Sequence, residues 1–166
     1  MSEVVTARRA FLVMACVVSA VVLRPVRAAG EEPPFAIHRR RMPAGEDLNV
    51  LLPPVLESFK RDALPAGATL KSDEDLNVTY RSGGDTVDMG ISKPESAADA
   101  REAIKVSREE AVASKISLRG ERFSLKGEPA YFHVGDFIAW SRGQYFFYAK
   151  ASSAATLARF MAVYPF

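Results

Sequence analysis

The stretch AYFHVGDFIAWSRGQYFFYA, at residues 130–149, carries the strongest structural pattern in the chain. Three runs of β-branched and aromatic residues are separated there by Gly135-Asp136 and Arg142-Gly143, both typical of tight turns. This pattern predicts three antiparallel strands. In the last of them, the aromatic residues at 145–148 point alternately to the two faces of the sheet, so both faces need cover. We therefore expect this strand in the middle of the sheet.

A second hairpin is expected upstream of this stretch. Residues 76–81 and 86–91 alternate between apolar and polar side chains, and the Ser-Gly-Gly-Asp segment between them favours a turn. Further upstream, Pro53-Pro54 can open a helix, and apolar residues at 55, 56, 59 and 63 recur at helical spacing. We accordingly predict a helix over about 53–63. Residues 116–126 are mixed in pattern and are expected to hold a strand and a loop.

Two further helices are predicted. One runs from about Glu95 to Ser114, where Ser92 and Glu95 are spaced as a capping box and alanines line the side toward the sheet. The capping spacing recurs at residues 107 and 110, which leaves open a break near Val106. The last helix runs from about residue 153 to 164, is apolar nearly all round, and is expected to be largely buried.

Together these elements predict an α+β fold, a mostly antiparallel sheet of about five to six strands with about three helices packed on it. Each hairpin is followed by a helix that opens with Ser-Ala-Ala, at 96–98 and at 153–155. A repeated strand–strand–helix unit would explain this, and it predicts a pseudo-twofold domain. We assign residues 48–166 to a single domain, since a mature chain of roughly 135 residues is large enough for one core.

The first thirty residues predict export. Arg8 and Arg9 precede an apolar run at residues 10–23, and the small residues Ala-Ala-Gly follow at 28–30. This layout is that of a cleavable secretory signal, which we assign to residues 1–28. The apolar run is shorter than the roughly 20 residues of a membrane-spanning helix. We expect a bacterial protein that is periplasmic or secreted, without stable membrane insertion after cleavage; the alternative is an uncleaved signal that tethers it to a membrane.

The route of export is a further prediction. The paired arginines followed by Phe11-Leu12 match the core of the twin-arginine signature, an address read by a bacterial receptor, and general secretion is the alternative. Residues 29–47 contain Pro-Pro at 33–34 and a basic run at 38–41. We expect these residues to form a flexible lead-in, although the basic run could contact an acidic partner.

Removal of the signal changes which partners the composition favours. The chain has 22 Lys+Arg against 20 Asp+Glu, and residues 1–28 hold four arginines and one glutamate. The remaining 18 basic and 19 acidic side chains give no electrostatic case for nucleic-acid binding, so no nucleic-acid partner is expected. Cys16 is the single cysteine and leaves with the signal. The mature protein would then have no disulfide, thiol nucleophile or thiolate metal ligand.

His133 and Asp136 are the catalytic candidates of the chain. They bracket two residues at the end of a predicted hairpin, and an imidazole oriented by a carboxylate can act as a general base. Packing without chemistry is the simpler explanation of a histidine between aromatic residues. The acidic segment at 73–77 lacks the glycine and the final glutamate of a calcium loop, so we predict no metal site and no cofactor.

Aromatic side chains supply the candidate ligand-binding residues. Side chains at alternate strand positions share one face and could line a binding surface, although core packing is the commoner use of such a pattern. The candidates are Tyr131, Trp140, Tyr145 and Tyr148.

A set of short motifs extends over roughly residues 51–150. With these motifs the chain resembles an uncharacterised family of exported bacterial domains. The resemblance implies an exported α+β domain and no known activity. The matching pieces are Leu51-Leu52-Pro53, Met89 at a strand end, Ala98-Asp99-Ala100 at a helix start, and Trp140-Ser141-Arg142-Gly143-Gln144-Tyr145 in a hairpin.

Two functional hypotheses follow from the sequence. The first is an exported soluble domain that binds a partner protein or a small apolar ligand through its aromatic sheet or a groove beside the last helix. The second is a periplasmic hydrolase-like enzyme that uses His133 with Asp136. An apolar pocket without convergent polar groups would support binding, whereas a cleft centred on His133 would support catalysis.

Overall fold

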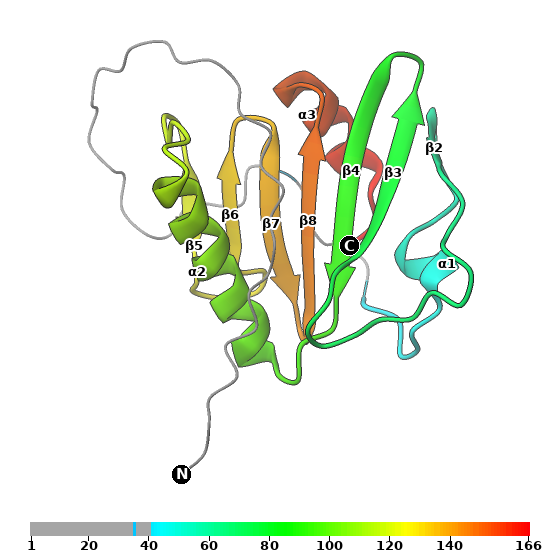
Figure 1. Ribbon diagram of the computed structural model, residues 1–166, viewed down its shortest axis with the longest axis horizontal. Coiled ribbons are helices and arrows are strands. Elements are labelled where there is room, and N and C mark those ends of the chain that lie inside the picture. The colour runs from blue at the N-terminus through cyan, green and yellow to red at the C-terminus, as the bar shows by residue number, and fades with distance from the viewer. Residues whose placement is uncertain (1–34, 36–40) are drawn as a thin grey trace.

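The computed structural model describes Phe35 and residues 41–166, which form an eight-stranded antiparallel sheet with helices on both faces (Figure 1). The α+β class is as predicted, but the sheet has more strands than the five to six expected. In chain order the elements are α1 Leu48–Leu51, β1 Val55–Leu56, β2 Phe59–Arg61, β3 Leu76–Ser82, β4 Asp85–Ser92, α2 Ala97–Ala113, β5 Arg122–Ser124, β6 Tyr131–Val134, β7 Phe137–Arg142, β8 Tyr145–Ala151 and α3 Ala154–Val163.

The order of the strands in the sheet is β1-β2-β3-β4-β8-β7-β6-β5. β8 lies between β4 and β7, which confirms the predicted central position of this aromatic strand. The β6–β7 and β7–β8 hairpins turn at Gly135 and Gly143. Their φ angles of +57° and +56° lie in the left-handed region that glycine adopts without strain.

The additional strands arise where the sequence predicted a helix. Residues 53–63 instead form β1 and β2, a short hairpin whose second strand pairs with β3. Phe59 is buried in this hairpin, and the amide of Asp62 donates to the carbonyl of Thr79. The prediction of a helix is wrong. The apolar spacing of this short segment is compatible with a helix or with strands, and pairing with β3 supplies the hydrogen bonds of the backbone, which favours strands. Within the mixed segment 116–126, β5 forms the opposite edge of the sheet.

The long helix α2 begins at a different cap from the predicted one. Ser96, not Ser92, is its N-cap, and the Ser96 hydroxyl oxygen accepts a hydrogen bond from the Asp99 amide. The helix is continuous through Val106. Ser107 does not cap a second helix, because its hydroxyl donates to the carbonyl of Ala103 within the same helix.

Alternate side chains of the central strands form two cores, one on each face of the sheet. On the face that α3 covers, Phe147 of β8 belongs to a core with Trp140 and Phe160. On the face that α2 covers, Phe146 belongs to a second core with Ile104. The predicted need for cover on both sides is therefore confirmed.

α3 buries one stripe rather than most of its surface. Its buried residues are Thr156, Leu157, Phe160 and Met161, while its alanines face outward. The prediction of a largely buried helix is therefore wrong, because no further described layer covers the outer side of α3, where small apolar side chains are tolerated.

The positions of the two helices also exclude the predicted pseudo-twofold arrangement. Both hairpins, β3–β4 and β7–β8, are followed by a helix, and β4 and β8 are antiparallel neighbours. A twofold axis that exchanges two antiparallel neighbours must stand normal to the sheet, and it would keep both helices on one face. They lie on opposite faces, so no such axis relates the two units.

The predicted signal at residues 1–28 and most of the predicted lead-in at 29–47 lie outside the described residues. Within the lead-in, Phe35 and Met42 pack against the core on the α3 side, and Glu46 forms an ion pair with Lys93. None of the helices in the described part of the chain has the length and apolarity needed to cross a membrane.

Candidate functional site

His133 and Asp136 make separate contacts. His133 lies on β6, where Nε2 is 3.2 Å from the carbonyl oxygen of Gly135 and the ring packs against Phe35 in a T-shaped contact. Asp136 lies in the turn that follows, and its carboxylate pairs with Lys150 of β8. No hydrogen bond or ion pair joins these two described side chains. The structure therefore does not bring the candidate catalytic pair together.

The environment of His133 predicts a pH-dependent stability. Burial lowers the pKa of His133, and Arg122 acts in the same direction against the hydrogen bond to Gly135. The unfolded chain then binds the proton more readily, so this stability is complete above about pH 6.5 and declines as the pH falls below that value. We expect the wild type to lose more free energy of unfolding than His133→Gln between about pH 8 and about pH 5 in urea titrations. Equal losses in the two proteins would contradict this assignment.

Three of the four candidate binding aromatics are core residues. Tyr131, Trp140 and Tyr145 are 3%, 0% and 8% exposed, because their face of the sheet is covered by α3 and the C-terminal residues. They cannot line an accessible binding surface. Tyr148 points to the opposite face and is only half-buried, so the ligand-binding prediction is retained for this residue alone.

On the opposite face, α2 covers only part of the sheet. It packs on β6, β7 and β8, and Figure 1 shows it in front of β5, β6 and β7, with β3 and β4 beyond its edge. The uncovered side chains of β3, β4 and the end of β8 are polar and exposed or half-buried. We call this surface the open face; its residues are Asn77, Thr79, Arg81, Thr86, Asp88 and Lys150.

Tyr148 stands at the border of the open face in a fixed position. Gly90 of β4 is its cross-strand partner, and a Cβ atom on Gly90 would overlap the Tyr148 ring and lie 2.8 Å from Asn77 Oδ1. The tyrosine hydroxyl donates to Asn77 Oδ1, and Asn77 Nδ2 donates to the carbonyl of Asp75 at 3.3 Å. Gly90 thus leaves space for the Tyr148 ring, and Asn77 accepts the hydrogen bond of the Tyr148 hydroxyl.

Burial and the carboxylates of Asp75 and Asp88 shift the pKa of the Tyr148 phenol. Burial first, and then the negative charges of Asp75 and Asp88, raise the pKa of Tyr148 to about 12. The phenol therefore keeps its proton at neutral pH and remains a donor to Asn77. Asp88 Oδ1 accepts from the Thr79 hydroxyl at 2.7 Å, whereas Asp75 Oδ1 is buried and has no hydrogen-bond partner.

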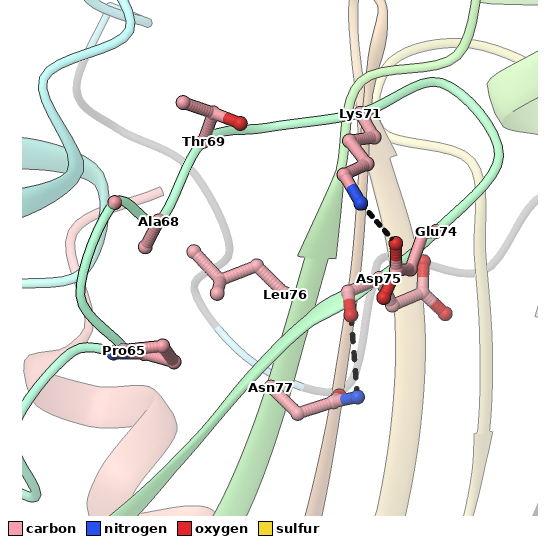
Figure 2. Close-up of a pocket in the computed structure, with 9 residues that line it drawn as sticks. Pro65, Ala68, Thr69, Lys71, Glu74, Asp75, Leu76 and Asn77 are labelled. Carbon is pink, nitrogen blue, oxygen red and sulfur yellow. Dashed lines mark hydrogen bonds and ion pairs between the residues drawn. The ribbon is translucent and has the colours of Figure 1, made fainter.

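Two cavities adjoin these groups. The first cavity, beside Tyr148 and Asp88, has a volume of about 300 Å³. The second cavity, inside the turn of residues 65–77, has a volume of about 310 Å³. Figure 2 shows the second cavity, with Leu76 directed between Pro65 and Ala68 and the Lys71–Glu74 ion pair at its rim. Both cavities are lined by Pro65 and Asn77, and we call them together the trough. The lining of the first cavity is Asp62, Ala63, Pro65, Asn77, Val78, Thr79, Asp88 and Tyr148.

From the sequence, the acidic segment 73–77 is only an unsuitable calcium loop and residues 76–91 are a hairpin, so the trough is not predicted. One usable signal was present, because Gly90 interrupts an otherwise regular strand pattern, and such a glycine marks the close approach of another group. The group that approaches, Tyr148, comes from a strand 58 positions later in the chain, which the hairpin pattern alone did not connect with it.

Within the described part of the chain, no group of three His, Cys, Asp or Glu residues is placed to hold a metal ion. Comparison of the chain with known protein families, curated proteins and solved structures gave no match.

Proposed function

We propose that the protein is an exported binding domain that recognises a segment of a partner protein at the trough. The signal-like sequence of residues 1–28 supports export. The observation that carries the binding proposal is the Tyr148 phenol, which Gly90 and Asn77 hold beside a cavity of about 300 Å³ at the edge of the open face. A rigid tyrosine set among exposed polar groups is a common centre of a protein-binding surface.

The lining of the trough favours a protein segment over a small apolar ligand. Carboxylate, amide and hydroxyl groups of Asp62, Asn77, Thr79 and Asp88 face the first cavity beside a few apolar side chains. Sites for small apolar ligands are instead concave and lined mostly by apolar side chains. A polypeptide supplies both alkyl groups and hydrogen-bonding groups, and it can extend from the trough over the neighbouring open face.

This proposal is tested by filling the trough. Thr79→Trp places a large side chain among the lining residues, while Glu102→Trp makes the same change on an exposed position of α2. Partner proteins are first identified on the immobilised mature domain, and their affinity for each variant is then measured. We expect Thr79→Trp to weaken binding at least about tenfold and Glu102→Trp to change it less than about twofold. Equal affinities for the two variants would refute the trough as the binding site.

A further inference from the structure

We infer that the segment recognised at the trough is basic, and that one of its lysine or arginine side chains binds among Tyr148, Asp75 and Asp88. This inference rests on the proposed function and adds the chemistry of the ligand. It follows from the hydrogen-bonding groups, the charges and the shape of the trough.

The groups around the Tyr148 hydroxyl are mainly acceptors. Asn77 Oδ1 already receives the hydroxyl proton of Tyr148. One oxygen of Asp88 is bound by Thr79, while Asp75 Oδ1 is buried without any donor. A buried carboxylate oxygen without a donor is unfavourable. Because Oδ1 is inaccessible, an incoming cationic N–H group would reach the Asp75 carboxylate through its other oxygen.

The charges of the surrounding side chains also favour a cation. Lys150 is the cross-strand partner of Asp88, but its ammonium group pairs with Asp136. Asp75 and Asp88 form no ion pair with any described side chain, although Arg81, which pairs with Asp62, lies near enough to Asp88 to interact with its charge. Three neighbouring cations are engaged in the pairs Lys150–Asp136, Arg81–Asp62 and Lys71–Glu74.

A further cation of the β2–β3 edge on this side of the sheet is Lys60. Lys60 is the cross-strand partner of Arg81, which itself faces Thr86 next to the β3–β4 turn. Asn77, which holds the Tyr148 hydroxyl, stands at the other end of β3. The positive charge of Lys60 is therefore set apart from the phenol, and an anionic ligand at the phenol would meet the carboxylates of Asp75 and Asp88 instead.

The shape and lining of the trough suit a long basic side chain. Ala63 and Pro65 supply alkyl surface in the cavity that Tyr148 and Asp88 also line. Lysine and arginine pack their aliphatic stems on such surface while the charged end stays with polar groups. A basic side chain can therefore lie along the alkyl lining and place its charged end at the carboxylates.

The experiment measures binding of acetyl-trilysine amide to the mature domain by calorimetry at low ionic strength, with acetyl-triglutamate amide as the probe of opposite charge. The test variant is Asp75→Asn with Asp88→Asn, which keeps the shapes of both side chains. The matched control is Glu102→Gln with Glu109→Gln on α2, which changes the net charge equally. We expect the test variant to bind trilysine about tenfold more weakly, the control to stay within about twofold of wild type, and triglutamate not to bind.

Two results would overturn the inference. One is unchanged trilysine binding in the Asp75→Asn/Asp88→Asn variant when its urea transition shows that it is folded. The other is an equal loss in the Glu102→Gln/Glu109→Gln control, which would mean that net charge alone attracts the peptide. Either result leaves the Thr79→Trp comparison intact, so failure of the basic-segment inference is distinguishable from failure of the trough as a partner-binding site.

Discussion

Replacement of Trp140 by alanine is expected to lower the free energy of unfolding by about 3–5 kcal/mol. Trp140 is the single tryptophan and is completely buried in the core under α3. Its ring stacks on Phe147 with centroids 5.1 Å apart and meets Tyr164 edge-on at 5.8 Å. Truncation would therefore remove apolar burial, leave a cavity and break two aromatic contacts between β7, β8 and the residues that follow α3.

The measurement is urea denaturation followed by circular dichroism, because the variant has no tryptophan fluorescence. Trp140→Phe is the matched control, since it keeps a ring in the stack and removes the indole Nε1, which is buried without a hydrogen-bond partner. We expect this control to lose less than about 2 kcal/mol, because deletion of an unsatisfied polar group offsets part of the lost packing. A loss below about 1 kcal/mol for Trp140→Ala, or a larger loss for phenylalanine than for alanine, would contradict the described core.

The hairpins and long helices could be predicted from the sequence because their signals are local. Alternating side chains and turn glycines specify β3–β4 and β6–β8, and the apolar pattern places the long helix α2, although its cap is Ser96 and not the predicted Ser92. β1 and β2 could not be predicted in the same way. These strands have only two and three residues, too few for an alternating pattern. β2 is held by pairing with β3, a strand that does not follow it directly in a tight hairpin.

The candidate site was less predictable than the fold. The sequence pattern places Tyr145 and Tyr148 on opposite faces of the sheet, but only the placement of α2 and α3 shows that Tyr148, and none of Tyr131, Trp140 and Tyr145, reaches the surface. His133 and Asp136 are close in sequence, but the register of β7 with β8 gives Asp136 a nearer partner in Lys150. Proximity along the chain is thus a poor guide to side-chain contacts at the end of a hairpin.

Gly90→Ala is expected to lower the free energy of unfolding by about 2 kcal/mol, although alanine ordinarily suits a strand better than glycine. The added methyl group would occupy space held by the Tyr148 ring and would come close to Asn77 Oδ1. The ring would have to leave its place on β4, and its hydroxyl would lose Asn77. Urea denaturation gives the change in stability, and trilysine titration should show weaker binding by the same variant, because the phenol that borders the trough is displaced.

A double-mutant cycle separates this steric effect from any general effect of position 90. In a Tyr148→Ala background the ring is absent, so Gly90→Ala should be neutral or should stabilise the fold by roughly 0.5 kcal/mol, through the lower conformational entropy of alanine in the unfolded chain. The expected coupling between positions 90 and 148 is then about 2–2.5 kcal/mol. Additive effects, within about 0.5 kcal/mol, would mean that the tyrosine ring does not lie on Gly90. The same cycle therefore tests the contact on which the position of the phenol, and with it the proposed binding site, depends.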